Sequence, residues 1–463
     1  MSATPSAPPR PGRLGAALGL PRLNGQRRLL AAVAIDSTGS GLALPFLLLY
    51  LTWQDRMTAA TAGTLLTVAG AAALAAGPLS GPLIDRWGPL PLVQAAHVLR
   101  ATAFCVYLAT GSPTTLLVAA TLAALGDNLF WPANRAFLAR RCHPGELMRW
   151  YGLERTLRNA GMAVGGLAAG FLAGHGLTGL RLVLAANAAS YLLATVLIAL
   201  LPATERRPSA GPVPAAPGNR TVGPRPGGAY LAMVAANTVL VLLCTALPVL
   251  VPLYVVQQLR QPAWVVGAVF ALNTLLVMAG QSLAVRYLER REHLRTLQRA
   301  ALVWSVAAVL FGAASGLPRS AALPLLALAV LVFTAAELMH APTSDVVAVR
   351  MAPDATPGRH LGLHQLSWGI GAAIAPLTLT AALALGPRWP WALLAVAALA
   401  AAAALAGVRR ATGPVLPEGV SGTGGAAGAR TGSKAGGDTG GDSGSGTGRE
   451  AGREAGRETG RDA

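Results

Sequence analysis

The chain has 463 residues, of which 53% are hydrophobic and only 12% are charged. A soluble protein of this length carries about twice that charged fraction, so the composition is typical of a membrane protein. The net charge of +18 could suggest nucleic-acid binding. The positions of the arginines favour a membrane topology instead, and no nucleic-acid partner is expected.

Long, nearly uncharged stretches recur along the chain, and each is long enough to cross a bilayer as an α-helix. The fold class expected is all-α, with twelve transmembrane helices in two pseudo-symmetric six-helix bundles. The expected spans are 29–52, 59–83, 90–110, 114–138, 150–173, 180–202, 229–257, 263–287, 299–316, 322–348, 361–386 and 390–408.

A weak internal repeat indicates that the two halves arose by duplication. Residues 127–163 recur 210 positions later, so that Asp127 returns as Glu337 and Pro132 as Pro342. The other matched pairs are Arg140 with Arg350, Arg149 with Arg359, Gly152 with Gly362 and Gly161 with Gly371. Many secondary transporters place a substrate site between two duplicated bundles in this way.

These spans divide the chain into five segments. Residues 29–202 and 229–408 are the two bundles, and residues 203–228 form a Pro-, Gly- and Arg-rich linker between them. Residues 1–28 form a Pro-rich N-terminal segment, and the Gly- and Ser-rich residues 409–463 are expected to be disordered. With eight basic and seven acidic residues, that tail adds only 8 − 7 = +1 to the net charge.

Arginines concentrate in every second connection between the predicted helices. The rich connections, together with the residues before the first helix, hold Arg27, Arg28, Arg140, Arg141, Arg149, Arg206, Arg207, Arg220, Arg225, Arg286, Arg290, Arg291, Arg295 and Arg299. The other connections hold at most one each, namely Arg56, Arg181, Arg260, Arg319 and Arg388. This is the positive-inside pattern, and it predicts a multi-pass protein of the inner membrane with both termini in the cytoplasm.

A short polar motif, GPLIDRWG, lies between the second and third predicted helices and contains Gly81, Asp85, Arg86 and Gly88. It resembles the G-x-x-x-D-R-x-G signature of the same loop in the major facilitator superfamily, although proline and leucine follow it here where the family has basic residues. The resemblance covers about residues 28–408 and implies an alternating-access transporter. It also implies that Asp85 gates transport by facing a helix N-terminus near 360–362. A simple polar turn is the alternative.

The fifth predicted helix contains regularly spaced glycines, namely Gly152, Gly161, Gly165, Gly166 and Gly170. Their spacing resembles the glycine motif of drug–proton antiporters in this superfamily, with Gly166 in place of a proline and Ala169 in place of a glycine. Small residues at such spacing let two helices pack closely. The resemblance favours export over import, and generic packing in an Ala- and Gly-rich chain is the alternative.

Three acidic residues lie inside predicted helices: Asp36, Asp127 and Glu337. A charge at the centre of a span costs about 2.5–3.5 kcal/mol, so an acid retained there is a candidate for proton coupling. Asp36 ranks first because no cation lies near it in the sequence. The alternative is a structural hydrogen bond or ion pair, for which the candidates are Arg135 with Asp345 and Glu154 with Arg158. His97 and Arg100 are expected to snorkel or to pair structurally.

In the superfamily the first, fourth, seventh and tenth helices line the central cavity. The substrate-contact candidates are Tyr50, Trp131, Arg135, Asn237, Tyr254 and His340. Because few of these side chains are charged, the sequence predicts a moderately apolar substrate that resembles a drug or a secondary metabolite.

No P-loop, nucleophile triad, metal cluster or cofactor motif is present in the sequence, so we expect neither an enzyme nor a bound metal or cofactor. The expected partners are a small-molecule substrate, protons and the lipid bilayer, and the protein is expected to be a monomer. The sequence thus predicts a proton-coupled exporter. An importer or uniporter of the same superfamily is one alternative, and a non-transporting membrane receptor or scaffold is another.

Reporter fusions along the chain test this topology, because each reporter is active on one side of the membrane only. Fusions after Thr52, Ser112 and Leu317 should report the outside. Fusions after Arg141, Arg220 and Arg410 should report the cytoplasm. A cytoplasmic signal after Ser112 would contradict the twelve-helix prediction.

Overall fold

The computed structural model describes residues 26–54, 57–74, 76–109, 112–141, 147–201, 227–288, 290–353 and 357–415. These described residues belong to one compact unit, residues 1–418. The greater part of the predicted N-terminal segment, linker and tail lies outside the described residues, so the structure leaves those predictions untested.

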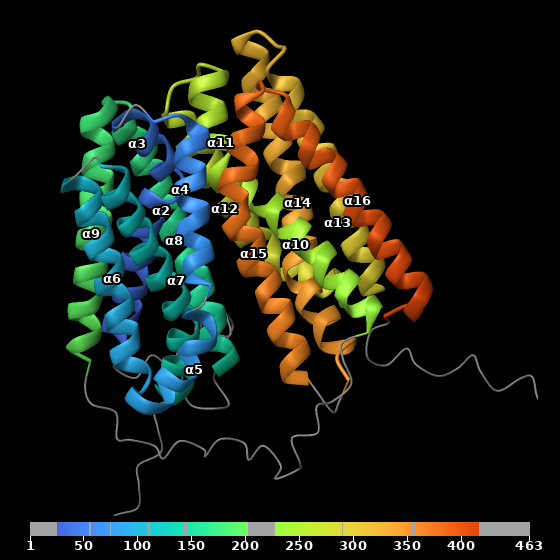
Figure 1. The fold of residues 1–463 in the computed structure, drawn as a ribbon, viewed down its shortest axis with the longest axis horizontal. Helices are drawn as coiled ribbons and strands as arrows, with labels where there is room; N and C mark the ends of the chain where they lie inside the picture. The colour runs from blue at the N-terminus through green and yellow to red at the C-terminus, as the bar shows by residue number, and fades with distance from the viewer. Residues whose placement is uncertain are drawn as a thin grey trace, which may run out of the picture. The chain divides into compact units, whose positions relative to one another are not determined.

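The described elements are all helices (Figure 1). The first half contains α2 (Arg27–Ala43), α3 (Leu47–Gln54), α4 (Ala59–Ala73), α5 (Ala76–Trp87), α6 (Pro89–Ala109), α7 (Pro113–Arg141), α8 (Leu147–Ala173) and α9 (Gly176–Ala199). The second half contains α10 (Gly228–Val249), α11 (Val251–Leu253), the π-helical turn η2 (Tyr254–Gln258), α12 (Trp264–Leu288), α13 (His293–Ala314), α14 (Arg319–Arg350), α15 (Pro357–Ala384) and α16 (Trp389–Thr412).

Three of the predicted spans are interrupted. α2 and α3 are bent by 45° around the turn that contains Pro45, where the missing N–H group of proline cannot continue the helical hydrogen bonds. The second span is divided into α4 and α5, and the seventh changes from α10 through α11 to η2 near Pro248 and Pro252. The described residues of each predicted span are therefore mainly helical, but these three spans are bent or divided.

Nine of the described helices are long and apolar enough to cross a membrane, and ten spans result if the bent pair α2 and α3 counts as one. The fold is thus that of an all-helical membrane protein with nine to ten candidate spans. The sequence-based number is higher because α4 is short and α8 is too polar to qualify. α8 carries Glu154, Arg155 and Arg158 in its first half.

A pair of tyrosines shows the duplication at atomic detail. The Tyr50 hydroxyl donates a hydrogen bond to the carbonyl oxygen of Tyr107 (2.9 Å). The Tyr254 hydroxyl donates to the carbonyl oxygen of Phe311 (2.5 Å). In both cases donor and acceptor are 57 residues apart. The same contact is therefore made at corresponding places in the two halves.

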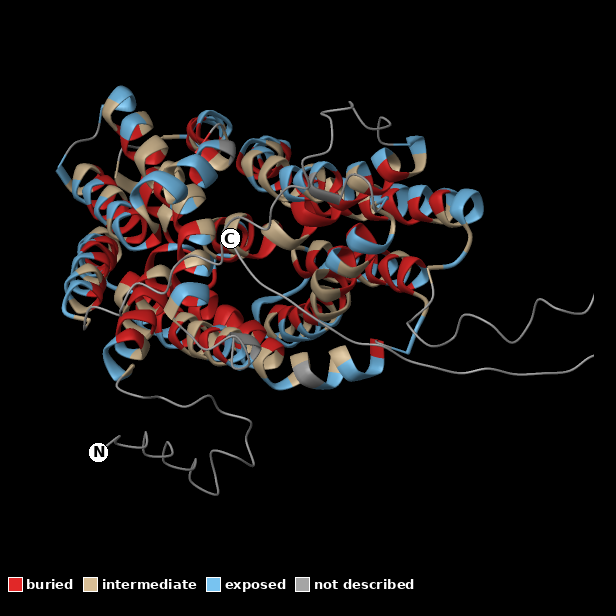
Figure 2. Ribbon diagram, turned by 90° about the horizontal axis from the view of Figure 1, so that it is seen from below, coloured by how far each residue is buried: buried red, intermediate tan, exposed pale blue. Residues whose placement is uncertain are grey.

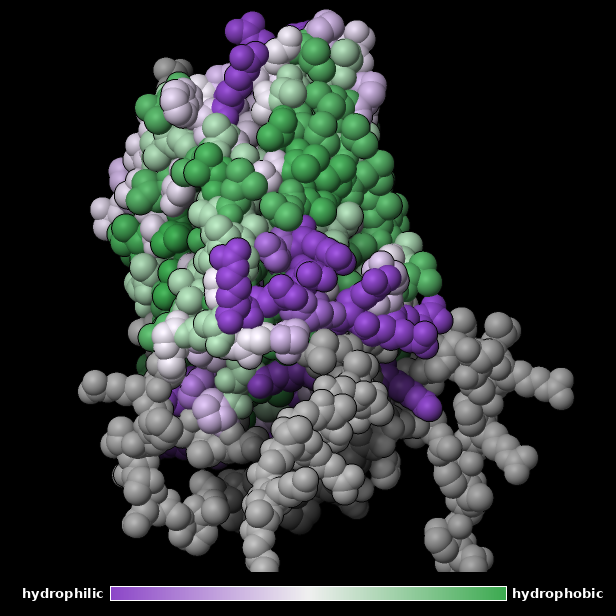
Figure 3. Space-filling model, turned by 90° about the vertical axis from the view of Figure 1, so that its right-hand side faces the viewer, coloured by the Kyte–Doolittle hydropathy of each residue, from purple (hydrophilic) through white to green (hydrophobic). Residues whose placement is uncertain are grey.

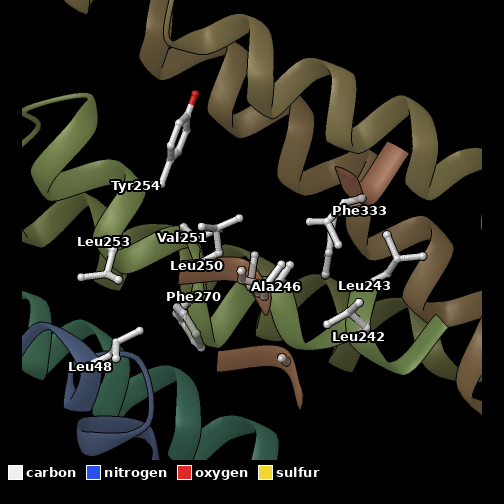
Figure 4. Close-up of a cluster of buried hydrophobic side chains, with 14 of the residues drawn as sticks. Leu48, Leu242, Leu243, Ala246, Leu250, Val251, Leu253, Tyr254, Phe270 and Phe333 are labelled. Carbon is white, nitrogen blue, oxygen red and sulfur yellow. The ribbon is translucent and has the colours of Figure 1, made fainter. Parts of the chain in front are cut away.

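Within each half the helices bury their apolar faces against one another, and the outer faces remain exposed (Figure 2). In the first half α2 packs against α8 and α9, and in the second half α13 packs against α14 and α16. Figure 4 shows a buried apolar cluster that is built mainly from α10 and α11 and includes Leu243, Ala246 and Leu250. Leu48 of α3 lies in the same cluster, so the two halves share part of their hydrophobic core.

We call the end of the helices at which Arg28, Arg140, Arg141, Arg290, Arg291, Arg409 and Arg410 lie the basic end, and the other end the opposite end. The halves meet where α4 packs against α15 and where α8 packs against α12. Toward the opposite end, the Leu377 N–H donates to Thr67 Oγ1 (3.0 Å) and Gln257 Nε2 donates to Thr52 Oγ1 (3.1 Å).

The glycines of α8 serve two different interfaces. A Cβ atom on Gly165 would lie 2.1 Å from the Thr38 carbonyl oxygen of α2, and one on Gly161 would lie 2.3 Å from Ser37 Oγ. Gly166 and Gly170 instead face α12, where Gly267 lies opposite them. Gly152 differs from the sequence-based expectation: it is exposed, and a Cβ there would meet no described atom within 4 Å. Gly152 therefore does not pack against a described neighbouring helix.

The GPLIDRWG motif is helical rather than a loop, which corrects the prediction from the sequence. Gly81, Asp85 and Arg86 lie in α5, and the turn into α6 is made by Gly88 alone. The φ of Gly88 is 84°, a left-handed conformation that glycine adopts without steric cost. Its N–H donates to the Ile84 carbonyl oxygen (2.8 Å), so Gly88 ends the helix in the manner of a C-terminal cap.

The close approach of α8 to α2 predicts different effects for two substitutions in the same helix. Gly165→Val should destabilise the protein by about 1–3 kcal/mol, because the new side chain would overlap the backbone of α2. Gly152→Val should have little effect, because Gly152 is exposed. Apparent melting temperatures of the purified variants in detergent test this, and equal losses would contradict the packing described here.

Candidate functional site

A network of charged side chains connects four helices of the first half. It consists of Asp36 on α2, His97 and Arg100 on α6, Asp127 on α7, and Glu154 and Arg158 on α8. We refer to these six residues as the charge network. All of them except Asp127 are largely removed from solvent. In a low-dielectric interior such charges persist only if they are paired.

Asp36 lies at the centre of the charge network, and its side chain is only 2% exposed. Arg158 Nη1 donates to Asp36 Oδ2 (2.7 Å). His97 Nε2 and Arg100 Nη1 lie 3.3 Å and 3.6 Å from Asp36 Oδ1. The sequence shows no cation near Asp36, but the fold brings three side chains that are cationic or can become so within reach of its carboxylate.

Arg158 connects two acids on different helices. Its Nε donates to Glu154 Oε1 (3.1 Å) one helical turn away, while its Nη1 binds Asp36. Asn134 Nδ2 donates to the same Glu154 oxygen (2.6 Å). The Glu154–Arg158 ion pair that the sequence offered as an alternative to proton coupling is therefore formed.

Arg100 lies between the two aspartates. Its Nη2 is 2.7 Å from Asp127 Oδ1, and its Nη1 is 3.6 Å from Asp36 Oδ1. The guanidinium carbon also lies over the rings of Phe130 (4.3 Å) and Tyr191 (5.3 Å). Such cation–π contacts stabilise a desolvated cation. Arg100 thus bridges the two aspartates and stacks on two aromatic rings.

The members of the charge network differ sharply in exposure. Arg100 is 4% exposed, whereas the Asp127 side chain is 61% exposed. The next residues on the same helical stripe are Trp131, which is 49% exposed, and the exposed Arg135. Asp127 is therefore the one member of the charge network whose side chain is largely exposed.

His97 contacts both its own helix and Asp36. Its Nδ1 lies 2.9 Å from the Val93 carbonyl oxygen, and its Nε2 faces Asp36. His97 therefore lies between the backbone of α6 and the Asp36 carboxylate.

The second half contains no copy of the charge network among its described residues. Its acid, Glu337, accepts a hydrogen bond from Asn273 Nδ2 (2.9 Å). His340 Nε2 lies 2.8 Å from Asn237 Oδ1, and Asn237 Nδ2 donates to Ser367 Oγ (2.8 Å). Two of the predicted cavity residues, Asn237 and His340, are thus buried partners that connect α10, α14 and α15.

Not all predicted cavity residues reach open space. Tyr50 and Tyr254 are fully buried and hold neighbouring helices together through the hydrogen bonds described above, which corrects their assignment as cavity residues. Trp131 and Arg135 are exposed on α7. These two residues are the members of the predicted set that remain available for a solute.

The other sequence-based pairings are only partly formed. Asp345 does not pair with Arg135 in the described contacts; instead His364 Nε2 lies 3.1 Å from its carboxylate. Asp85 is exposed, and the structure records no contact between it and the described part of α15. The gating contact implied by the family resemblance is therefore not recorded among the described residues and stays a prediction.

Sequence reasoning assigned His97 and Arg100 only a structural role. The structure shows that Arg100 connects Asp36 to Asp127 and that His97 contacts Asp36, so both belong to the charge network. Their spacing of three residues places both on one helical face, in a stretch with no other charge. That spacing is the signal from which their partnership could have been inferred. Among the described residues, no group of His, Cys, Asp and Glu could hold a metal ion.

Comparison with known proteins gives the family of the fold. The sequence profile described as Major Facilitator Superfamily matches residues 29–336. The chain is similar to the "Multidrug resistance protein MdtH" of Enterobacter sp. (strain 638), with 24% identity over 300 residues, 64% of this chain and 71% of that protein. A protein of the same name from Edwardsiella ictaluri (strain 93-146) is 32% identical over 96 residues, which is 21% of this chain and only 24% of that protein.

A solved structure confirms the fold independently of sequence. The chain superposes on a POT family transporter in complex with a thioalcohol-conjugated peptide with a TM-score of 0.68 and 12% identity. The superposition covers 84% of this chain and 96% of that transporter. The similarity therefore shows the architecture of the helices.

The charge network predicts a large difference between two arginines of α8. Arg158→Gln should destabilise the protein by about 3–5 kcal/mol, because it leaves buried carboxylates without their closest cation. Arg155→Gln should cost less than about 1 kcal/mol, because Arg155 is exposed and makes one hydrogen bond to Gln281.

Apparent melting temperatures of the two variants test this difference. The double variant Asp36→Asn/Arg158→Gln should recover part of the loss, because it removes the charge that Arg158→Gln leaves unpaired. Equal effects at Arg155 and Arg158, with no recovery in the double variant, would show that the charge network does not stabilise the fold.

Proposed function

Since the chain belongs to the major facilitator superfamily of secondary transporters, we propose that it is a proton-coupled exporter of a small, moderately apolar solute. The single observation that carries the proposal is the charge network, whose one exposed member, Asp127, is joined through Arg100 to the occluded Asp36. The proposal includes twelve membrane spans, with the basic end in the cytoplasm of the inner membrane, and a monomer as the working unit.

Asp127 is proposed to face a water-filled space between the two halves. A charged side chain at the middle of a span is too costly to leave in lipid, so it faces either protein or a water-filled cavity. Asp127, Arg135 and Asp345 are all exposed, although they lie within long helices of the two halves. A water-filled space between the halves would explain why all three charged side chains are exposed.

Proton exchange is proposed to occur at Asp127, with Arg100 as the pivot. In the observed arrangement Arg100 binds the charged Asp127 closely (2.7 Å) and Asp36 more loosely (3.6 Å). Protonation of Asp127 would remove one carboxylate charge and leave Arg100 free to bind Asp36. Because Arg100 is a buried cation that needs a partner, the charge state of Asp127 would alter the contacts of α2, α6 and α7 together.

A count of charges supports one exchangeable proton. The charge network holds three acids (Asp36, Asp127 and Glu154) and two arginines (Arg100 and Arg158). With His97 neutral its charge is 2 − 3 = −1, and one added proton makes it neutral. A buried cluster favours the neutral total. Because these groups lie within ion-pair distance of one another, we assign the exchanged proton to the charge network as a whole, with Asp127 as its exposed member.

This ranking of the acids differs from the one based on sequence. Asp36 is occluded and has three partners, which suits an ion that remains charged and organises the others. Asp127 is exposed and has Arg100 as its recorded ion-pair partner, which suits a group that exchanges protons with water. Glu337 of the second half ranks below Asp127, because it is only partly exposed and is bound to the neutral Asn273.

Alternating access would follow from movement of the two halves against each other. The recorded contacts between Thr52 and Gln257, and between Thr67 and Leu377, lie toward the opposite end. The exposed Arg135 and Asp345 lie toward the basic end. Arg155 also donates to Gln281 of the other half (3.3 Å), so the halves touch nearer the basic end as well. With the basic end in the cytoplasm, Arg135 and Asp345 lie on the side from which an exporter takes up its substrate.

Two observations favour export over import. The glycines of α8 resemble the motif of drug–proton antiporters, and four of them lie at close helix contacts. The relative that matches over 300 residues is named a multidrug resistance protein.

The exposed Trp131, beside Phe130 and Arg158, offers an aromatic surface for a moderately apolar solute. An importer or uniporter of the same superfamily is the alternative.

Reconstituted vesicles with an imposed pH gradient test the proposal, after a substrate has been identified by an efflux screen with and without a protonophore. Asp127→Asn should abolish gradient-driven accumulation yet preserve substrate counterflow, because the amide cannot exchange a proton but keeps the shape of the side chain. Glu337→Gln is the matched control in the other half and should keep most of the driven transport. If Asp127→Asn, Asp36→Asn and Glu337→Gln all retain full gradient-driven transport, proton coupling through these acids is wrong, and facilitated diffusion is favoured instead.

A further inference from the structure

A dense group of arginines lies at the basic end of the second half, outside the charge network. Residues 286–299 and 409–410 contain seven arginines and two glutamates, a net charge of 7 − 2 = +5. We call the following six residues the arginine cluster: Arg290, Arg291, Arg295, Arg299, Arg409 and Arg410. They come from α13, from the end of α16 and from the connection that precedes α13.

The arginine cluster is held in place by Glu292. Arg409 Nε donates to both Glu292 carboxylate oxygens (2.9 and 2.8 Å), and Arg295 Nε lies 3.8 Å from one of them. The His293 N–H donates to the Val415 carbonyl oxygen (3.0 Å), which fixes the chain after α16 to the start of α13. The two helix ends are therefore tied together, and the one described acid of the group is already neutralised.

Three members of the arginine cluster have no ion-pair partner among the described residues. No ion pair is recorded for Arg290, Arg299 or Arg410 with any described residue. Arg291 stacks on Tyr287, with its guanidinium carbon 4.7 Å from the ring centroid, and donates to the Tyr287 hydroxyl (2.9 Å). Like charges held this close repel one another, so an anionic ligand would be attracted to this surface.

The arginine cluster continues directly into a surface that faces lipid. Arg295 and Arg299 begin an exposed stripe on α13 that runs on through Leu302, Val306 and Val309. Figure 3 views the molecule from the side of α13 and α16 and shows a hydrophobic area with a group of hydrophilic side chains directly below it. Arginines at the end of an apolar stripe lie at the depth of the lipid headgroups.

The neighbouring face of α16 leaves room for an acyl chain. Its exposed residues next to the arginines are small, namely Ala403, Ala404 and Gly407. A Cβ on Gly407 would meet no described atom within 4 Å. An acyl chain could therefore approach the backbone of α16 just above Arg410.

From this geometry we infer that the arginine cluster and the adjoining faces of α13 and α16 bind a phospholipid with an anionic headgroup. The guanidinium groups would hold the headgroup phosphate, and the apolar stripe of α13 would take the acyl chains. The charge complementarity and the continuity with the apolar stripe both favour a lipid over a soluble anion. Lipid binding at this site does not depend on the proposed direction or coupling of transport.

Lipid titrations with the purified full-length protein test this site. Native mass spectrometry should show phosphatidylglycerol bound more tightly than phosphatidylcholine with the same acyl chains. Arg295→Gln/Arg299→Gln should weaken phosphatidylglycerol binding by about tenfold or more, since two headgroup contacts are lost. Arg140→Gln/Arg149→Gln removes two exposed arginines at the basic end of the first half and should change the affinity less than about twofold.

Two further measurements distinguish a lipid site from a loss of folding and from a site for soluble phosphate. The apparent melting temperature of each double variant without added lipid should match that of the wild type, because the substituted side chains are exposed. Glycerol 1-phosphate should not compete with phosphatidylglycerol, because it lacks acyl chains. Equal losses in both double variants, or effective competition by glycerol 1-phosphate, would overturn the proposed lipid site.

Discussion

The pairing of Asp36 with Arg158 inside a membrane-spanning bundle is the interaction on which the rest of the first half depends. Because neither charge can be buried alone without a penalty of several kcal/mol, α2 and α8 must approach closely enough for a 2.7 Å contact. The glycines of α8 make that approach possible, since Gly161 and Gly165 lie directly against the α2 backbone and side chains. The charge pair and the small residues are thus two parts of one constraint: the glycines bring the helices together, and the charges fix their register.

The two halves have kept one architecture but have come to place their charges differently. Arg100 lies over Phe130 in the first half, with 4.3 Å between the guanidinium carbon and the ring. At the corresponding positions of the second half, Trp304 lies 5.2 Å from His340. Both halves therefore contain a contact between a polar side chain and an aromatic ring. In the first half Arg100 of α6 lies over a ring of α7, whereas in the second half the ring of Trp304 belongs to α13 and the polar His340 to α14. The second-half contact lacks a permanent charge. This asymmetry favours proton exchange in the first half, with the second half supplying a largely neutral and rigid partner surface.

The sequence predicted the positions of the helices well, because apolar length and the absence of charge are direct consequences of the bilayer. It also singled out Asp36, Asp127 and Glu337 as candidates, since an acid within an apolar stretch is conspicuous, and their role in coupling stays a prediction. It did not predict that His97, Arg100 and Arg158 would converge on Asp36, because those contacts join residues up to 122 positions apart and depend on the packing of α2, α6 and α8. Tyr50 and Tyr254 were misassigned for a similar reason: a helical face that points inward can meet a neighbouring carbonyl group as well as a cavity.

If an exporter of this kind exchanges its proton at Asp127, as proposed, binding of the transported solute should displace a proton from the charge network. Proton release from purified protein, followed with a pH-sensitive dye in weakly buffered solution as substrate is added, tests this claim most directly. The account predicts about one proton released for each substrate bound by the wild type, no release from Asp127→Asn, and release retained in Glu337→Gln. Equal release from the wild type and Asp127→Asn would contradict it, as would substrate binding by the wild type without any proton release.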